Sequence, residues 1–249
     1  MIYVRWFIKP RPGNFGDLLT PIILKHFDVD FEFSSSGFDA ICVGSIASIA
    51  GYKTIVLGSG IISLNDKLDP EADWRFVRGP YTRRQVLYHG GKCPKIYGDP
   101  GLLLPLMCER SEIEYPVGIV PHFADYQYAK EKYPDAHIIN VLNQDPISVV
   151  KEITKCEKII SSSLHGLITA HAYGIPAAWV HFNGPITIKN KSYDDIKFID
   201  YYSSAGDYLP IKSTVEKPHY TDLKIDLDPI IEIFVKLAIR SKRNNYGNT

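Results

Sequence analysis

The sequence lacks an excess of charge of either sign. Lysine plus arginine and aspartate plus glutamate both number 28, so the formal net charge is zero. Nucleic-acid binders usually carry a basic excess, and we therefore predict no nucleic-acid partner. Disorder as a global state is excluded as well, because hydrophobic residues make up 45% of the chain and charged residues only 22%.

Cysteine is scarce, and long apolar runs are missing. The four cysteines show no Cys-x-x-Cys or Cys/His spacing that would suit zinc, and a disulfide framework would be unusual in a chain of this size. No run approaches the roughly 20 apolar residues that span a bilayer, and the apolar start at residues 2–8 is too short for a signal peptide. We predict a cytoplasmic protein with no transmembrane segment, no metal site and no cofactor.

Short apolar runs alternate with helix-start signals, a pattern typical of an α/β fold. The runs are rich in valine and isoleucine, as buried parallel strands are. The pairs Thr20-Pro21, Gly79-Pro80, Asp145-Pro146 and Asp228-Pro229 predict helices with proline at the first position, and Gly174 suits a left-handed C-cap. This alternation implies right-handed crossovers and a mostly parallel sheet. The expected strands are residues 2–8, 40–43, 54–57, 74–77, 117–120, 137–140, 158–160 and 177–180.

The expected strands fall into two groups, separated by the polar residues 107–116. We predict an N-terminal domain at residues 1–108, a C-terminal domain at residues 116–225, and a C-terminal helix with a polar tail at residues 226–249. Two open sheets that face each other would form a cleft at the carboxyl ends of their strands, where ligands bind in such folds.

Glycine-containing turns follow several strands of the first half. Gly13-Asn14-Phe15-Gly16-Asp17 stands before a helix, where a close backbone and free amides favour an anion, so Asn14 and Asp17 are binding candidates. A tight turn capped by Asp17 explains the pattern equally well. Gly58-Ser59-Gly60 is a further binding candidate, but it lacks the full spacing of a dinucleotide site. Asp99, in Gly98-Asp99-Pro100-Gly101, either initiates a turn or binds an acceptor.

Arg78 follows the expected strand at residues 74–77. At the carboxyl end of that strand it would point into the cleft, where a guanidinium matches carboxylates and phosphates bidentately. In the second half, Pro121-His122 again stands at a strand end, which makes His122 a weaker candidate for the cleft.

A more specific pattern is Ser161-Ser162-Ser163-Leu164-His165-Gly166, at the change from a strand to a helix. Hydroxyl groups, unpaired helix amides and the positive end of the helix dipole would converge there and suit a phosphate. His165 in the first helical turn would point toward the same place and could exchange protons near neutral pH. The alternative is a series of capping serines beside a packed histidine.

Together these segments resemble the polysaccharide pyruvyltransferase family, in particular its branch that forms ketals on exopolysaccharides. The matching motifs run in the order of the family from about residue 13 to residue 204, which is most of the chain. They are residues 14–17, 44–46, 57–60, 77–83, 98–105, 118–122, 160–166, 170–176 and 198–203.

The resemblance implies a glycosyltransferase-B-like fold of two facing Rossmann-like domains. It also implies phosphoenolpyruvate as donor and a sugar residue of a growing glycan as acceptor; a lipid-linked acceptor would bring the protein to the membrane surface. Arg78 matches the conserved arginine of the family, and His165 matches its motif histidine. Some relatives have an arginine two residues before that histidine, where this chain has Ser163. Either another cation holds the donor, or this branch binds it differently.

On this reading Arg78 clamps the carboxylate or the phosphate, His165 is the general acid/base, and the three serines with the helix amides hold the phosphate. Two alternatives remain. A glycosyltransferase that uses a nucleotide sugar could share the fold, because a fold does not determine function. A non-catalytic glycan-binding assembly subunit could instead stack sugars on aromatic side chains, for which the candidates are Trp179, Tyr201, Tyr202 and Tyr208.

Overall fold

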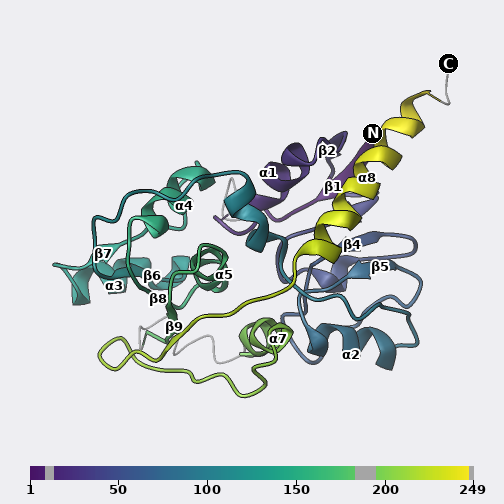
Figure 1. The fold of residues 1–249 in the computed structure, drawn as a ribbon. Helices are drawn as coiled ribbons and strands as arrows, with labels where there is room; N and C mark the ends of the chain where they lie inside the picture. Colours follow the sequence, from purple (N-terminus) through teal and green to yellow (C-terminus); the bar gives the residue numbers. More distant parts are fainter. Residues whose placement is uncertain (9–13, 183–194, 247–249) are drawn as a thin grey trace.

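The computed structural model describes residues 1–8, 14–182 and 195–246, which form a mixed α/β protein with two five-stranded sheets (Figure 1). The strand order of the first sheet is β2-β1-β3-β4-β5, and all of its pairings are parallel. Its strands are β1 (Ile2–Arg5), β2 (Phe31–Phe33), β3 (Ala40–Ile41), β4 (Ile55–Leu57) and β5 (Asp73–Phe76).

The second sheet has the order β10-β9-β8-β6-β7 and is parallel except for β10, which pairs antiparallel to β9. Its strands are β6 (Gly118–Val120), β7 (His137–Ile138), β8 (Ile159–Ser161), β9 (Ala177–Trp179) and β10 (Tyr220–Thr221). The two parallel-dominated sheets confirm the predicted α/β class. The eight expected strands are all present, whereas β2 and β10 were not predicted.

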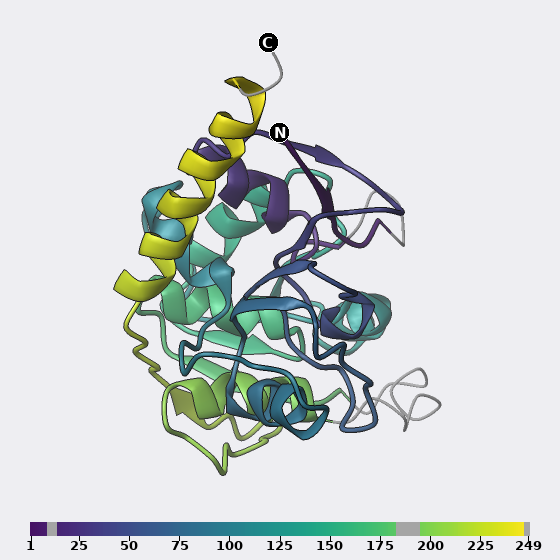
Figure 2. The ribbon, with the colours of Figure 1, turned by 90° about the vertical axis from the view of Figure 1, so that its right-hand side faces the viewer.

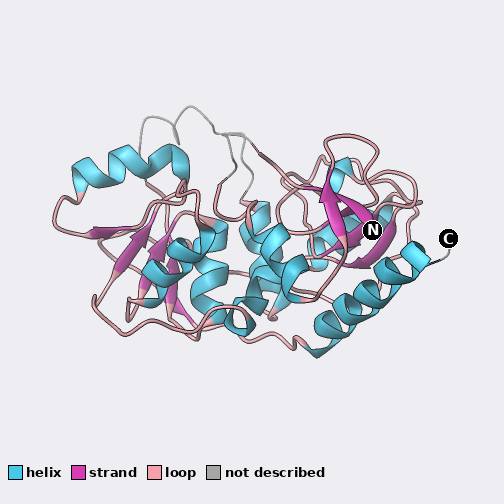
Figure 3. Cartoon of the chain, turned by 90° about the horizontal axis from the view of Figure 1, so that it is seen from above, coloured by secondary structure: helices cyan, strands magenta, loops and turns pink. Residues whose placement is uncertain are grey.

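The helices lie largely between the two groups of strands, as the view from above shows (Figure 3). The α-helices are α1 (Leu19–His26), α2 (Pro80–Tyr88), α3 (Tyr126–Lys132), α4 (Pro146–Thr154), α5 (Leu164–Ala172), α7 (Ile196–Ser204) and α8 (Asp228–Tyr246). Three short 3-10 helices are η1 (Ala47–Ile49), η2 (Pro100–Leu106) and η3 (Phe123–Asp125). Helix α5 packs closely against η2, so the two halves meet along this contact.

The helix ends follow most of the expected caps. Asp145 accepts a hydrogen bond from the backbone N–H of Ile147 at 3.0 Å, and α2 begins at the proline that follows Gly79. Gly174 has a φ of +64°, the predicted left-handed conformation after α5. The cap predicted at Thr20 is wrong, because α1 already begins at Leu19 and the Thr20 hydroxyl accepts from the backbone N–H of Val43 at 3.2 Å.

The last helix of the chain returns to the first sheet. Helix α8 runs beside the N-terminus, and Figures 1 and 2 show the two from perpendicular directions. The amino group of Met1 donates to the carbonyl oxygen of Ser241 at 2.9 Å, and the rings of Phe27 and Phe234 stack with centroids 5.0 Å apart. Helix α8 therefore stabilises the half of the molecule that the chain builds first.

Candidate active site

A pocket of about 360 Å³ opens where the carboxyl ends of strands from both sheets meet. Phe7 and Ser45 follow strands of the first sheet, while His122 and Ser163 follow strands of the second. Such strand ends are the usual ligand site of open α/β sheets, so the pocket lies where a cleft was predicted. Its polar lining residues are Asn14, Asp17, Ser45, Ser48, His122, Ser163, His165 and Lys197.

The turn before α1 presents Asp17 to this pocket. The Asn14 side-chain oxygen accepts from the backbone N–H groups of Gly16 at 3.0 Å and of Asp17 at 3.4 Å, which fixes the turn. Asp17 is only 8% exposed, and burial raises the pKa of its carboxyl to about 6, although the nearby His165 opposes the shift. Asn14 and Asp17 thus lie at the predicted site, while Gly13 of the same motif is outside the described residues.

Asp17→Asn is expected to stabilise the fold at neutral pH. The carboxyl has a pKa of about 6 in the folded protein and 3.8 ordinarily, so the folded state disfavours its charged form and stability falls as pH rises from about 4 through 6. A shift of about 2 units corresponds to about 2–3 kcal/mol. Chemical denaturation should show the variant more stable by this amount at pH 8 and equal to the unmutated protein at pH 3. An equal difference at both pH values would contradict the assignment, and the exposed Asp135→Asn is the control.

The three serines before α5 do not share one role. The Ser161 hydroxyl lies 2.8 Å from the carbonyl oxygen of Val120 and accepts from the N–H of Ser163, while the Ser162 hydroxyl accepts from the N–H of His122 at 2.8 Å. Both hydroxyl groups are buried and bond to the backbone, because strand ends leave amide and carbonyl groups that need partners. Of the three, only Ser163 lines the pocket.

Gly166 lies within α5 rather than in the pocket lining. A Cβ at this position would be 2.5 Å from the Ser161 hydroxyl oxygen and 2.8 Å from the Val120 side chain. The glycine therefore allows the helix to approach strands β6 and β8 closely, a packing role instead of the predicted substrate contact.

His165 lies in the first turn of α5, as predicted, and lines the pocket with 12% of its side chain exposed. Its Nε2 atom is buried and lies 3.5 Å from Oδ2 of Asp99. Asp99 is completely buried and does not line the pocket, so the predicted acceptor contact is not open to it.

His122 lines the pocket from the second sheet. Burial, and next the charge of Lys197, lower the pKa of its imidazole to about 4. A ring nitrogen of His122 accepts from the backbone N–H of Ala124 at 3.4 Å. The imidazole is therefore neutral near pH 7, which suits hydrogen bonding to a ligand better than donation of a proton.

Arg78 does not point into an open cleft, contrary to prediction. It is completely buried, and its Nη2 atom lies 3.2 Å from Oδ2 of Asp200 in α7. The same nitrogen donates to the carbonyl oxygen of Ile61 at 2.6 Å, while Nη1 donates to the Ser45 hydroxyl at 2.7 Å. Because Ser45 lines the pocket, Arg78 supports the pocket wall from behind.

The turn Gly58-Ser59-Gly60 is also behind the pocket wall. The Ser59 hydroxyl donates to the carbonyl oxygen of Gly44 at 2.8 Å. A Cβ at Gly60 would lie 2.3 Å from the Arg78 guanidinium carbon, and Gly58 adopts a φ of +85° next to Pro100. These three residues shape the wall and hold Arg78, instead of lining the pocket as binding residues.

The motif Arg78-Gly79-Pro80 joins α2 to α7. A Cβ at Gly79 would lie 1.8 Å from the carbonyl oxygen of Asp200, so only glycine allows the backbone of α7 to come this close. Asp200 in turn accepts from both the N–H and the hydroxyl of Thr82, at 2.9 and 2.7 Å. The motif that predicted a ligand clamp thus fixes the joint between the halves.

Lys197, which the sequence did not predict, is the cationic side chain among the described lining residues. It lies in the first turn of α7, and burial, followed by the charge of Arg78, lowers the pKa of its ammonium to about 8. It directly precedes Phe198, where one of the family motifs begins, but a single lysine in a helix has no recognisable pattern. Lys197 reaches the pocket because of its position in α7.

The aromatic candidates for sugar stacking are mostly inaccessible. Tyr201, Tyr202 and Trp179 are exposed by 2% or less, and only Tyr208 stands in solvent, at 55%. The interpretation as a glycan-binding subunit therefore loses three of its four candidate residues.

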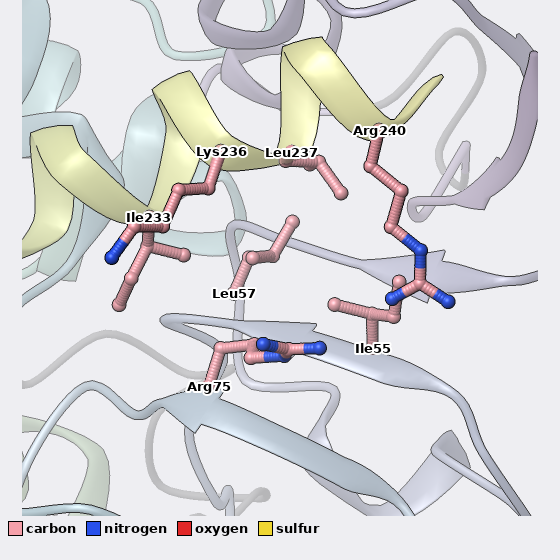
Figure 4. A pocket seen from close by; sticks show the side chains of 7 residues that line it. All are labelled: Ile55, Leu57, Arg75, Ile233, Lys236, Leu237 and Arg240. Carbon is pink, nitrogen blue, oxygen red and sulfur yellow. The ribbon is translucent and has the colours of Figure 1, made fainter. Parts of the chain in front are cut away.

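A second, smaller pocket of about 140 Å³ lies between α8 and strands β4 and β5 (Figure 4). Its rim carries Arg75, Lys236 and Arg240 over an apolar floor, and its lining includes no acid, histidine or hydroxyl group. Arg75 is already paired with Asp73, and Lys236 with Glu232. The pocket at the strand ends, by contrast, brings a carboxyl, an imidazole and an ammonium group together, and it is therefore the candidate active site.

Among residues 1–8, 14–182 and 195–246, no three His, Cys, Asp or Glu side chains are grouped so as to hold a metal ion. Within the same ranges, no helix combines the length and the apolar character needed to cross a membrane.

Comparisons with known proteins give two relatives. The chain is 33% identical to the uncharacterized protein L143 of Acanthamoeba polyphaga mimivirus over 271 aligned positions, which cover 100% of this chain and 91% of the relative. It is 27% identical to the succinoglycan biosynthesis protein ExoV of Rhizobium meliloti, over 76% of this chain and 62% of that protein. No solved structure matches the chain.

The family model described as polysaccharide pyruvyl transferase matches residues 4–181. This range contains both sheets apart from β1's first residues and β10, and it includes all of the described pocket lining except Lys197. The match spans well over half of the chain, and so this protein belongs to the polysaccharide pyruvyl transferase family.

Proposed function

We propose that this protein transfers pyruvate from phosphoenolpyruvate to a sugar residue of a glycan or a glycan precursor and forms a pyruvate ketal. Family membership supports pyruvyl transfer. The observation that carries the proposal is the meeting of Asp17, His165 and Lys197 in one pocket at the strand ends. Two α/β halves with a pocket between them also fit a glycosyltransferase-B-like arrangement.

The donor has two anionic groups, a carboxylate and a phosphate, and the pocket offers partners for both. Lys197 supplies the positive charge that Arg78, closed off behind the wall, does not present to the pocket. Ser163 and the first amides of α5 supply hydrogen-bond donors, because the first N–H groups of a helix lack partners within it. Lys197 thus takes the place of the arginine that some relatives have where this chain has Ser163.

Ketal formation takes two steps, and each of them moves one proton from a sugar hydroxyl. A sugar hydroxyl adds to C2 of phosphoenolpyruvate and loses its proton, while the C3 methylene gains a proton and becomes a methyl group. A second hydroxyl then displaces the phosphate at C2, and its proton leaves with the phosphate as hydrogen phosphate. His165 moves the proton in the first step, and Asp17, with a pKa of about 6, is available for proton exchange in the second.

Donor binding is expected to weaken at alkaline pH because Lys197 loses its charge there. The pKa of Lys197 is lowered to about 8, so the ammonium form is lost as pH rises through this value. The KM for phosphoenolpyruvate should rise about tenfold per pH unit above pH 8, up to the value of a variant without the charge. A charged hydrogen bond contributes about 1.5–3 kcal/mol, so Lys197→Met should raise KM by about 10- to 100-fold.

Lys197→Arg separates this effect from other alkaline titrations, because arginine keeps its charge throughout the range. The alkaline rise in KM should disappear in this variant. If the rise persisted unchanged in Lys197→Arg, another group would be responsible and Lys197 would not be the donor-binding cation.

The proposed function is tested by incubating the protein with phosphoenolpyruvate and a panel of β-galactosides, other glycosides and lipid-linked oligosaccharides. We expect phosphate release together with a mass gain on the sugar that equals pyruvate minus water. Turnover of a nucleotide sugar, without reaction of phosphoenolpyruvate, would instead support the glycosyltransferase alternative. Glycan binding without any turnover would support the assembly subunit. Phosphoenolpyruvate as donor would place the reaction in the cytoplasm, where the acceptor could be presented at the membrane surface.

A further inference from the structure

We infer that Asp99 is a positioning residue for His165: its buried carboxylate fixes the ring and decides which ring nitrogen carries the proton. The expected effect on kcat rests on the proposed function, whereas the expected position of the proton on the His165 ring does not. The sequence left Asp99 as either a turn former or an acceptor contact, and its burial removes the second possibility.

One oxygen of Asp99 is held by the fold. Oδ1 accepts from the backbone N–H of Gly101 at 2.8 Å and thereby caps η2, whose first residue is Pro100. Helix η2 packs against α5, the helix that carries His165. The cap therefore fixes the direction of the whole carboxyl group and turns its second oxygen toward α5.

The second oxygen and the imidazole face each other with no other partner. Oδ2 of Asp99 and Nε2 of His165 are both buried, and neither forms a hydrogen bond with a group in the described part of the chain. They lie 3.5 Å apart. Buried polar atoms are almost always paired, and hydrogen bonds at catalytic residues are often long before the substrate binds. The geometry points to an Nε2–H bond to Asp99 that tightens on donor binding.

The other side of the ring is set by Gly16. A Cβ at this residue would lie 2.0 Å from Nδ1 of His165 and 2.4 Å from its Cγ, so the absence of a side chain leaves the space that the ring occupies. The imidazole is thus held between Gly16 and Asp99. Asp17, next to Gly16, is a further carboxyl close to the ring, while Cys42 and Tyr201 lie near Asp99.

This arrangement assigns a role to each nitrogen. With Nε2–H bonded to Asp99, the free lone pair is on Nδ1, which accepts the proton of the attacking sugar hydroxyl. The positive imidazolium that results is balanced by the Asp99 carboxylate until the proton passes to C3 of the donor. Asp99 touches neither substrate and acts only through His165.

Asp99→Asn tests the inference with little change in shape. The side-chain oxygen of the asparagine keeps the cap on Gly101, because only the oxygen can accept from that N–H. The amide nitrogen must then take the place of Oδ2 and donate to Nε2, which moves the imidazole proton to Nδ1. We expect kcat to fall by about 10²- to 10⁴-fold, the usual contribution of a correctly protonated acid/base group, with the KM for phosphoenolpyruvate unchanged.

The tautomer is measured independently of activity. Nitrogen-15 NMR spectra of protein labelled at histidine, at a pH where the ring is neutral, should show His165 protonated at Nε2 in the unmutated protein and at Nδ1 in Asp99→Asn. The His165→Gln spectrum identifies the signal. If phosphoenolpyruvate is not the donor, the kinetic expectation fails but the change of tautomer remains, so the two failures are distinguishable.

Asp145→Asn is the matched control, because Asp145 also caps a helix that begins with proline but is exposed and lies outside the pocket lining. It should change neither the His165 spectrum nor kcat. The inference is overturned if His165 is protonated at Nδ1 in the unmutated protein. It is equally overturned if Asp99→Asn raises KM instead of lowering kcat, because Asp99 would then contact the donor.

Discussion

Asp200→Ala is expected to lower the free energy of unfolding by about 3–5 kcal/mol, the usual cost of removing one partner of a buried ion pair. Asp200 and Arg78 are both completely buried, and Nη2 of Arg78 lies 3.2 Å from Oδ2 of Asp200. The substitution would leave the guanidinium without its counter-charge and remove both acceptors of Thr82. Urea unfolding measured at pH 7, followed by fluorescence, gives the difference directly.

A neighbouring ion pair provides the control. Arg75 and Asp73 lie 2.6 Å apart, but their side chains are 45% and 37% exposed. Asp73→Ala should therefore cost less than about 1 kcal/mol, because solvent screens such pairs. The double variant Arg78→Met with Asp200→Leu should recover most of the stability lost in Asp200→Ala, since apolar side chains can replace a buried pair. A cost of Asp200→Ala as small as that of Asp73→Ala would show that the buried pair does not stabilise the joint.

The same pair affects how loss of activity at Arg78 is interpreted. Arg78 donates to Ser45, and Ser45 lines the pocket. An inactive Arg78→Ala enzyme would not by itself identify a contact with the donor, because the pocket wall and the contact of α7 with α2 would change together. Asp200→Asn, which keeps the Arg78 side chain, should impair activity as well if Arg78 acts through the wall.

Local sequence patterns were sufficient to predict most strands and helix ends. Buried strands such as β4 and β8 are short apolar runs, and the cap at Asp145 needs only adjacent residues. The two missed strands carry weaker signals. Strand β2 is three residues long with Glu32 at its centre, and β10 has two residues whose pairing with β9 is antiparallel. Both depend on a partner strand that is already in place.

The candidate site was predictable where strand ends decide the position and unpredictable where distant segments meet. Asn14, Asp17, Ser163 and His165 follow strands or begin helices, so their place at the carboxyl edge could be inferred. The direction of Arg78 depends on Asp200, which belongs to a helix after the second sheet. The same helix brings Lys197 to the pocket. Neither contact leaves a local pattern in the sequence.

His165→Ala is expected to reduce kcat by about 10²- to 10⁴-fold in the phosphoenolpyruvate assay, the range typical of a lost acid/base group. His165 lines the pocket, and its Nε2 atom faces the buried Asp99. Among the other titratable side chains of the described lining, His122 has its pKa lowered to about 4 and Lys197 is assigned to the donor anion, which leaves Asp17 as the remaining group for proton transfer. The phosphate released per unit time, at saturating donor, is the measured quantity.

The fold should tolerate this substitution, which keeps the result interpretable. His165 follows the cap of α5, and alanine is a good helix former, so the helix itself should persist. His26→Ala, at an exposed position at the end of α1, is the control and should leave kcat unchanged. If His165→Ala kept the kcat of the His26→Ala control, the proton in the first step would have to come from Asp17. In that case the pH dependence of kcat should follow the Asp17 carboxyl, with its pKa of about 6, and the Asp99–His165 contact would be structural only.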